Sequence, residues 1–157
     1  MKLFGMILIF FSSVAFFFER SRAIGRATAL MGELYAFMKQ ARIEVGCYLK
    51  PLSEIRTSSP LLSELGFFST LEGQGIESAY LLIEDGLSLS DGERGTLRGI
   101  VASLGKGYAD DEVKSIDMAL FELSGMLNRK REEEPRKRKL ILTLSVASSL
   151  ALIILLV

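Results

Sequence analysis

The side chains that most often do chemistry in proteins are scarce in this sequence. Its 157 residues contain no His and a single Cys, Cys47. The chain therefore lacks the commonest general base, the usual metal ligands and any internal disulfide. Cys47 lies within a helical pattern, where we expect a reduced core thiol. The alternative, a reactive thiol, requires an electropositive neighbour such as Arg42 or Lys50.

Two short stretches have residue types that could bind a ligand, and a simpler structural interpretation is favoured for each. The carboxylates Asp110, Asp111 and Glu112 offer ligands to a divalent cation, but at the start of a helix they are expected to complement its positive end. The glycines of Glu72–Gly75 are expected in a loop that lacks the strand and the Lys of a phosphate site. The sequence therefore predicts no catalytic residue, no metal and no cofactor.

Three carboxylates are the candidates for binding a partner. Glu44 lies at the edge of an apolar helical stripe, as a boundary charge or as a buried contact that fixes helix register or a partner. Glu84 and Asp85 are expected on a solvated face. Between Ala27 and Asn128 the chain carries 8 basic and 15 acidic side chains. This acidic interior favours a basic partner face and disfavours nucleic acid.

Basic residues flank the acidic interior on both sides. Such flanks are typical of a domain held at an anionic lipid surface. This basic collar comprises Arg20, Arg22, Arg26, Arg129, Lys130, Arg131, Arg136, Lys137, Arg138 and Lys139.

Two uncharged runs predict membrane helices. Leu140–Val157 has 18 residues, which as a helix would measure roughly 27 Å, close to the hydrocarbon thickness of a bilayer. Lys and Arg stay on the cytoplasmic side of such helices, so the collar places the middle of the chain in the cytoplasm. Leu3–Phe18 is shorter, and we favour a retained span over a cleaved leader because three phenylalanines close it. The predicted organisation is a membrane helix over residues 1–19, a cytoplasmic domain over 20–139 and a membrane helix over 140–157.

The residues between the runs predict helices only. Apolar steps averaging 3.6 residues mark a long helix that ends at Pro51. Shorter helices are expected after Ser59, which with Pro60 forms a helix start, over 76–85, and after Ser90, which with Glu93 forms a capping box. The fold class expected is all-α, an antiparallel helical bundle. The two main apolar stripes are Leu30, Leu34, Phe37, Ala41, Val45 and Tyr48, and Val113, Ile116, Leu120, Leu123 and Leu127.

Two expectations concern the chain ends. Pro135 is predicted to separate the last bundle helix from the final span, since proline interrupts helices. Small residues such as Ser12 and Ser149 would let the two spans approach closely in lipid. Whether the spans pair, or the small residues only face lipid, is left open.

Taken in order, these features resemble the stage III sporulation protein AB family over nearly the whole chain. The matching residues are Lys2, Leu3 and Gly5; Leu30, Leu34 and Phe37; Glu44, Val45 and Tyr48; Pro51, Leu52, Glu54 and Ile55; Ser103, Leu104 and Gly105; and Ile153, Ile154, Leu155 and Leu156.

The resemblance implies a subunit of a channel-like assembly between mother cell and forespore. Its cytoplasmic domain would be similar to the F-protein platform of type II secretion systems, an all-helical bundle that docks a cytoplasmic secretion-type ATPase. Further partners would be other membrane subunits and anionic lipid, in the outer forespore membrane of the mother cell. The alternative is a small membrane-embedded regulator or pore-forming protein without an ATPase. The sequence leaves homo-oligomerisation open.

Overall fold

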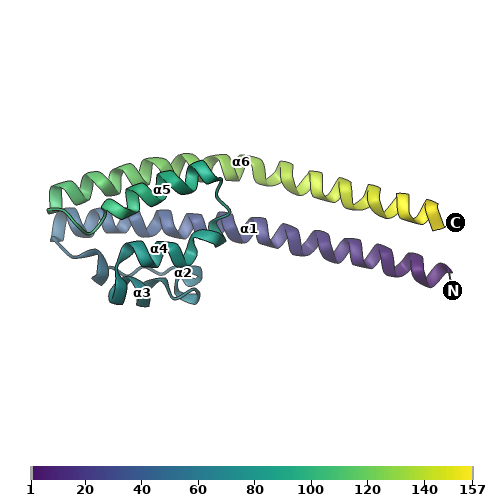
Figure 1. The fold of residues 1–157 in the computed structure, drawn as a ribbon, viewed down its shortest axis with the longest axis horizontal. Coiled ribbons are helices and arrows are strands. Elements are labelled where there is room, and N and C mark those ends of the chain that lie inside the picture. The colour runs from purple at the N-terminus through teal and green to yellow at the C-terminus, as the bar shows by residue number, and fades with distance from the viewer. Residues whose placement is uncertain (1, 157) are drawn as a thin grey trace. The chain divides into compact units, whose positions relative to one another are not determined.

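The chain is described by a computed structural model that contains helices and turns (Figure 1). It describes residues 2–156, and within them the side chains of 2–10, 13, 14, 149, 152, 153, 155 and 156 lie outside the described part. No strand occurs between residues 2 and 156. The all-α prediction is therefore confirmed.

The elements follow one another with short connections. They are α1 (Lys2–Tyr48), η1 (Leu52–Glu54), α2 (Pro60–Glu64), α3 (Phe67–Gln74), α4 (Ile76–Glu84), η2 (Asp85–Leu87), α5 (Asp91–Ser103) and α6 (Ala109–Leu156), where η denotes a 3-10 helix. The chain divides into two compact units. Ala27–Arg129 is called the bundle below, and Met1–Arg26 with Lys130–Val157 the terminal unit.

The apolar stripe of α1 forms the centre of the bundle core. Leu30, Leu34, Phe37 and Ala41 are almost fully buried, as the 3.6-residue period predicts. Burying a Leu or Phe side chain stabilises a fold by about 1.5–3 kcal/mol, so this stripe is a main source of the bundle's stability. Tyr48, the last residue of the predicted stripe, is exposed instead.

Helices α1 and α6 run antiparallel within the bundle. A Cβ added to Gly46 would lie 3.4 Å from Val113 Cγ2, and one turn earlier on α1 and one turn later on α6 the Arg42 guanidinium pairs with Asp117. Ile116 lies in the core of the same interface. The apolar seam predicted for the last helix is thus an internal contact of the bundle.

Aromatic side chains join the short helices to α1. The Phe37 ring packs edge-on against Phe67 at 5.2 Å between ring centroids and against Phe68 at 6.0 Å. The predicted loop from Glu72 to Gly75 is wrong, because α3 continues to Gln74. Phe67 and Leu71, one helical turn apart, are both buried, and this packing outweighs the low helix propensity of Gly73, two residues after Leu71.

Of the two predicted helix caps, one is present in the structure and the other is replaced by a different bond. The Ser90–Glu93 capping box is confirmed in both directions at the start of α5. Ser59 is the residue before α2, as predicted, but its hydroxyl bonds to Thr57 Oγ1 at 2.8 Å rather than to the helix. The Glu33 carboxylate of α1 accepts the backbone N–H of Leu62 instead, at 3.0 Å.

The prediction that Pro135 separates helix from span is wrong, because α6 is helical on both sides of this residue. Proline removes one backbone bond and costs about 3 kcal/mol within a helix. Two i,i+4 ion pairs bridge the proline and offset part of that cost. They join Lys137 Nζ to Glu133 at 2.6 Å and Arg138 Nη2 to Glu134 at 2.5 Å. Both glutamates are thus paired.

Among the described residues, no helix has a stretch that is long and apolar enough for a membrane crossing. Both predicted runs, Leu3–Phe18 and Leu140–Val157, fall in part on side chains outside the described residues. So do Gly5, Ser13 and Ser149, on which the predicted pairing of the runs depends.

Candidate functional site at the end of the bundle

Helix α1 ends in an unusual backbone conformation. It stops at Tyr48, three residues before the predicted end at Pro51. Leu49 then has φ 53°, and its N–H donates to Val45 O at 3.1 Å. A left-handed residue that closes a helix in this way is usually glycine, because a Cβ clashes there at a cost of roughly 1–2 kcal/mol. Leu49 is therefore a strained residue on the surface.

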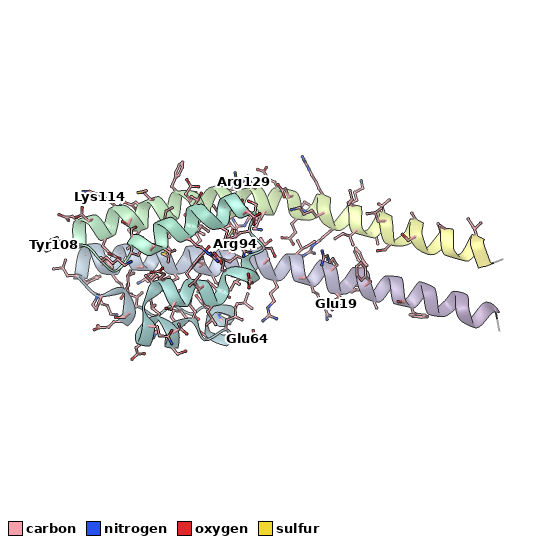
Figure 2. The ribbon with its side chains drawn as sticks, viewed as in Figure 1. Glu19, Glu64, Arg94, Tyr108, Lys114 and Arg129 are labelled. Carbon is pink, nitrogen blue, oxygen red and sulfur yellow. The ribbon has the colours of Figure 1, made fainter. Side chains whose placement is uncertain are left out.

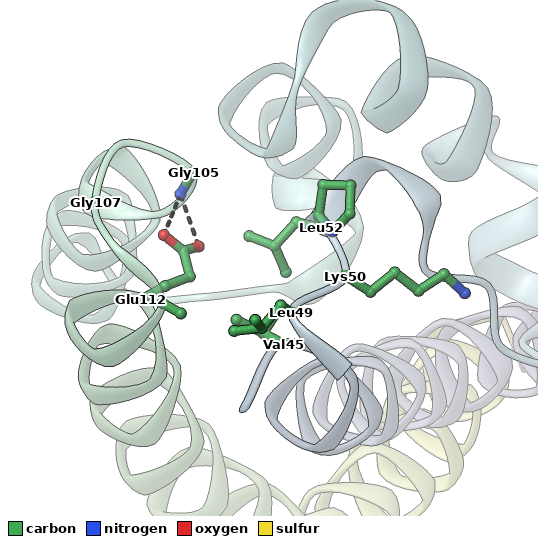
Figure 3. Close-up of a pocket in the computed structure, with 9 residues that line it drawn as sticks. Val45, Leu49, Lys50, Leu52, Gly105, Gly107 and Glu112 are labelled. Carbon is green, nitrogen blue, oxygen red and sulfur yellow. Dashed lines mark hydrogen bonds between the residues drawn. The ribbon is translucent and has the colours of Figure 1, made fainter. Parts of the chain in front are cut away.

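A buried carboxylate holds the turn between α5 and α6. Both oxygens of Glu112 lie within reach of the Gly105 N–H, at 2.7 and 2.9 Å (Figure 3). Glu112 is buried, and Gly105 has φ 78°, which a glycine adopts without strain. Asp110, Asp111 and Glu112 lie in the first turn of α6 as predicted, but Glu112 also fixes the preceding turn.

The end of α1 and this turn enclose a pocket. Its volume is about 230 Å³, and it is lined by Val45, Leu49, Lys50, Pro51, Leu52, Gly105, Gly107, Ala109 and Glu112. In Figure 3, Leu49 and Val45 form one side and Glu112 another. A second hollow of about 320 Å³ shares Pro51, Leu52 and Gly105 with the first. The two hollows thus form one uneven surface at this end of the bundle.

Three large side chains lie at or next to this surface: Leu49 lines the first hollow, and Tyr48 and Tyr108 are sequence neighbours of residues that line it. Tyr48, Leu49 and Tyr108 are 75%, 73% and 88% exposed, and they are called the rim below. Figure 2 labels Tyr108 at the bundle's end. Tyr and Leu side chains combine large apolar area with few rotatable bonds, and tyrosine in particular is enriched at protein interfaces. The rim has the composition of a protein contact.

Ion pairs set the charge beside the rim. Lys50 Nζ lies 2.8 Å from a Glu44 oxygen, and Gln40 donates to the other oxygen at 2.8 Å. The bond from Lys50, and then that from Gln40, lowers the pKa of Glu44. Lys106 lies 3.7 Å from Glu77. Glu44 is thus a boundary charge that positions Lys50 beside the pocket.

Glu84 does not lie on a solvated face, so that expectation is wrong. Its carboxylate is 2% exposed and accepts the Nε–H of Arg98 at 2.7 Å, with Arg94 Nη1 at 3.9 Å. Burial of a carboxylate is costly unless it is paired, and the bond from Arg98 lowers the pKa of Glu84. The hydroxyl of Tyr80, one turn away on α4, is also buried, and burial raises its pKa. Asp85 is exposed as expected, with its carboxylate 3.4 Å from Arg94 Nη1.

Among the three candidate partner-binding carboxylates, Glu44 lies far from Glu84 and Asp85. A Cβ on Gly86, next to Asp85, would lie 2.9 Å from Leu30 Cδ2. Glu44 lies fourteen residues further along α1, roughly 20 Å at helical rise. Glu84 and Asp85 are therefore remote from the rim, and Glu44 alone lies near it.

The sequence does not indicate the rim or the bond from Glu112 to the preceding turn. The spacing of Tyr48 fits the helical period and predicts a core position, yet the helix ends there. The turn Gly105–Gly107 followed by an aromatic residue was the one local signal for Tyr108. The free thiol Cys47, expected in the core, is exposed beside the rim.

Elsewhere the collar is partly paired. Arg129 Nη2 lies 3.0 Å from Glu93 within the bundle, while Arg138 pairs with Glu134 within the terminal unit. Among the described residues no group of three or more His, Cys, Asp or Glu is arranged to hold a metal ion.

The comparisons with known proteins give one positive result. The family model for stage III sporulation protein AB matches residues 73–157, which include α4, α5 and α6. Searches of curated proteins and of solved structures returned no match, so the likeness to a type II secretion F-protein stays a prediction. Because the family match spans more than half of the 157 residues, this chain belongs to the stage III sporulation protein AB family.

Proposed function

We propose that this chain is a non-enzymatic membrane platform of a sporulation channel between mother cell and forespore, and that a cytoplasmic secretion-type ATPase docks on its bundle. The family supports a role in sporulation. The observation that carries the docking step is the exposed rim of Tyr48, Leu49 and Tyr108 around the two hollows. A surface of this kind marks a protein contact more often than it occurs by chance on a small bundle.

The position of the rim suits a platform. Along α1, Tyr48 lies 21 residues beyond Ala27, where the bundle begins, which is about 32 Å at 1.5 Å per residue. A partner bound at the rim would therefore leave the other end of the bundle, where the chain continues into the terminal unit, uncovered. The acidic excess of the bundle would attract a partner with a basic face.

The membrane part of the proposal is supported by the terminal unit. Large apolar side chains are exposed on both of its helices, among them Phe11, Phe16, Leu144, Leu150 and Ile154. Exposed apolar surface of this extent needs a lipid or protein environment. We place Leu3–Phe18 and Leu140–Val157 in the membrane and the basic collar at its cytoplasmic surface.

Co-purification tests the docking step. The full chain, solubilised in neutral detergent, is expected to retain a secretion-type ATPase encoded beside it. Tyr108→Ser should reduce the amount retained. Phe121→Ser is the matched control, because Phe121 is a similarly exposed aromatic on α6 that lies thirteen residues, roughly 20 Å, from Tyr108.

Charge reversal separates the rim from the acidic face. If the acidic excess of the bundle attracts the ATPase, Asp85→Lys should weaken retention further, because Asp85 is 92% exposed. Retention that falls equally in Tyr108→Ser and Phe121→Ser would contradict docking at the rim. A parent protein that never retains an ATPase would contradict the platform role itself.

A further inference from the structure

The terminal unit contains a groove between its two helical segments. Its volume is about 390 Å³, within the range of roughly 300–1,000 Å³ that is usual for small-molecule sites. Its lining consists of Ser12, Phe16 and Arg20 from α1 and Ile141, Leu144, Ser145 and Ser148 from α6. All of these residues belong to the terminal unit.

The lining residues differ in chemical type from one end of the groove to the other. Ser12, Phe16 and Arg20 follow one another at intervals of four residues, so they lie on one face of α1 over about 12 Å. The segments run antiparallel, because Gly25 lies against Arg138 while Ser12 and Ser148 line the same groove. Arg20, itself part of the collar, therefore marks one end of the groove, and Ser12 and Ser148 mark the other end.

Charge and polarity select one class of occupant. Among the described residues that line the groove none is acidic, and Arg20 is the one that carries a charge. A guanidinium binds phosphate well because its fork of N–H donors matches the phosphate oxygens. Phe16 and Leu144, beside it, are apolar and more than half exposed. A cation at one end of an apolar groove complements a molecule with an anionic head and a hydrocarbon tail.

We propose that this groove binds one anionic phospholipid, with its phosphate on Arg20 and an acyl chain over Phe16 and Leu144. The small side chains Ser12 and Ser148 leave the room that the chain end occupies. The inference rests on the proposed membrane anchoring, and it adds a specific lipid site to the general attraction between the collar and an anionic surface. It is independent of the docked ATPase.

Native mass spectrometry of the full chain in neutral detergent tests the site, with phosphatidylglycerol and phosphatidylcholine as probes. The parent is expected to retain one phosphatidylglycerol at concentrations where phosphatidylcholine dissociates. Arg20→Gln should weaken this retention about fivefold, as expected for one cation at an anionic lipid. Arg22→Gln is the matched control: Arg22 is exposed two residues away and does not line the groove.

A second variant separates the groove from the headgroup. Ser148→Phe fills the tail end while keeping Arg20, and it should also reduce retention. Inorganic phosphate should not compete, because it lacks the acyl chain. Equal losses in Arg20→Gln and Arg22→Gln, equal retention of both lipids, or a lipid-free dimer that fills the groove with a second copy would each overturn the proposal.

Vesicle flotation distinguishes this proposal from the anchoring on which it rests. The parent and Arg20→Gln should both float with vesicles of equal parts phosphatidylcholine and phosphatidylglycerol, because the apolar segments remain. A parent that does not float would refute the anchoring and the lipid site together. A parent that floats without preferring phosphatidylglycerol in mass spectrometry would refute the lipid site alone.

Discussion

Replacing Leu49 with glycine should stabilise the bundle relative to replacing it with alanine. Both changes remove the same exposed side chain, so their difference isolates the left-handed backbone at φ 53°. A non-glycine residue in this conformation costs about 1–2 kcal/mol. The greater freedom of glycine in the unfolded chain offsets about 0.4–1 kcal/mol of that relief. Leu49→Gly should therefore exceed Leu49→Ala in unfolding free energy by about 0.8 kcal/mol, the difference between the midpoints of these ranges.

The unfolding free energy of the parent should lie between those of the two variants or close to that of the glycine variant. Leu49 is 73% exposed, so it buries about a quarter of a side chain, worth at most about 0.5–0.8 kcal/mol. Urea unfolding of the full chain in neutral detergent, followed by tyrosine fluorescence, measures the difference, because Tyr80 lies in the core. Equal stability of the two variants, or greater stability with alanine, would refute the left-handed conformation.

The same glycine variant separates stability from binding. Leu49→Gly removes one of the three rim side chains while relieving strain, so it should bind the ATPase less tightly although the bundle is no less stable. If Leu49→Gly loses ATPase binding only in proportion to a loss of bundle stability, the idea that the Leu49 side chain itself contacts the ATPase is contradicted. Strain held at a surface residue is a feature of binding sites more than of ordinary turns.

Three further substitutions probe the bundle. Glu84→Gln should lower the unfolding free energy by about 1.5–3 kcal/mol near neutral pH, because it removes a charged hydrogen-bond acceptor of Arg98. Folding lowers the pKa of Glu84, so the parent's advantage in unfolding free energy is complete above about pH 4.3 and declines as the pH falls through the folded pKa. Urea titrations at several pH values would measure this decline. Gly99→Ala should gain up to about 1 kcal/mol in thermal unfolding, because a Cβ there meets no atom within 4 Å; Gly86→Ala, whose Cβ would lie 2.9 Å from a core leucine, should show no such gain. Glu112→Ala should lower the unfolding free energy by about 1–3 kcal/mol and speed hydrogen exchange in the α5–α6 turn, because the turn amide loses its partner. Glu112→Gln keeps an oxygen acceptor and should lower the unfolding free energy less. Equal losses for the two variants would contradict the assigned bond.

Patterns that depend on one helix were predictable from the sequence. The buried stripe of α1 follows from its 3.6-residue period, and the start of α5 follows from Ser90 and Glu93, whose bonds lie within four residues. Each of these features is decided by local geometry and by which face is apolar. Neither requires knowledge of another element.

Features decided by contacts between distant residues were not predictable. The neighbours of Glu84 in the sequence predict a solvated residue, because none of them shows that Arg98, fourteen residues later, binds its carboxylate. Tyr48 fits the apolar period, but the left-handed residue after it ends the helix. The rim depends on a turn that lies about sixty residues further along the chain, so no local pattern indicated it.

Helix ends near proline were the other source of error. Pro51 and Pro135 were both expected to end a helix. The first helix ends three residues before its proline, and the other continues through it. Two ion pairs that span Pro135 offset part of the lost backbone bond. Their i,i+4 spacing can be read from the sequence, but the spacing alone does not decide whether the helix continues through the proline.

The measurement that tests the central claim most directly is the dissociation constant between the full chain in detergent and the secretion-type ATPase, compared for the parent, Tyr108→Ser and Phe121→Ser. Docking at the rim predicts a loss of about 1–2 kcal/mol for Tyr108→Ser, a five- to thirtyfold weaker complex, as for an interface anchor. Phe121→Ser should bind as the parent does. Equal affinity of the parent and Tyr108→Ser would contradict the rim as the docking surface.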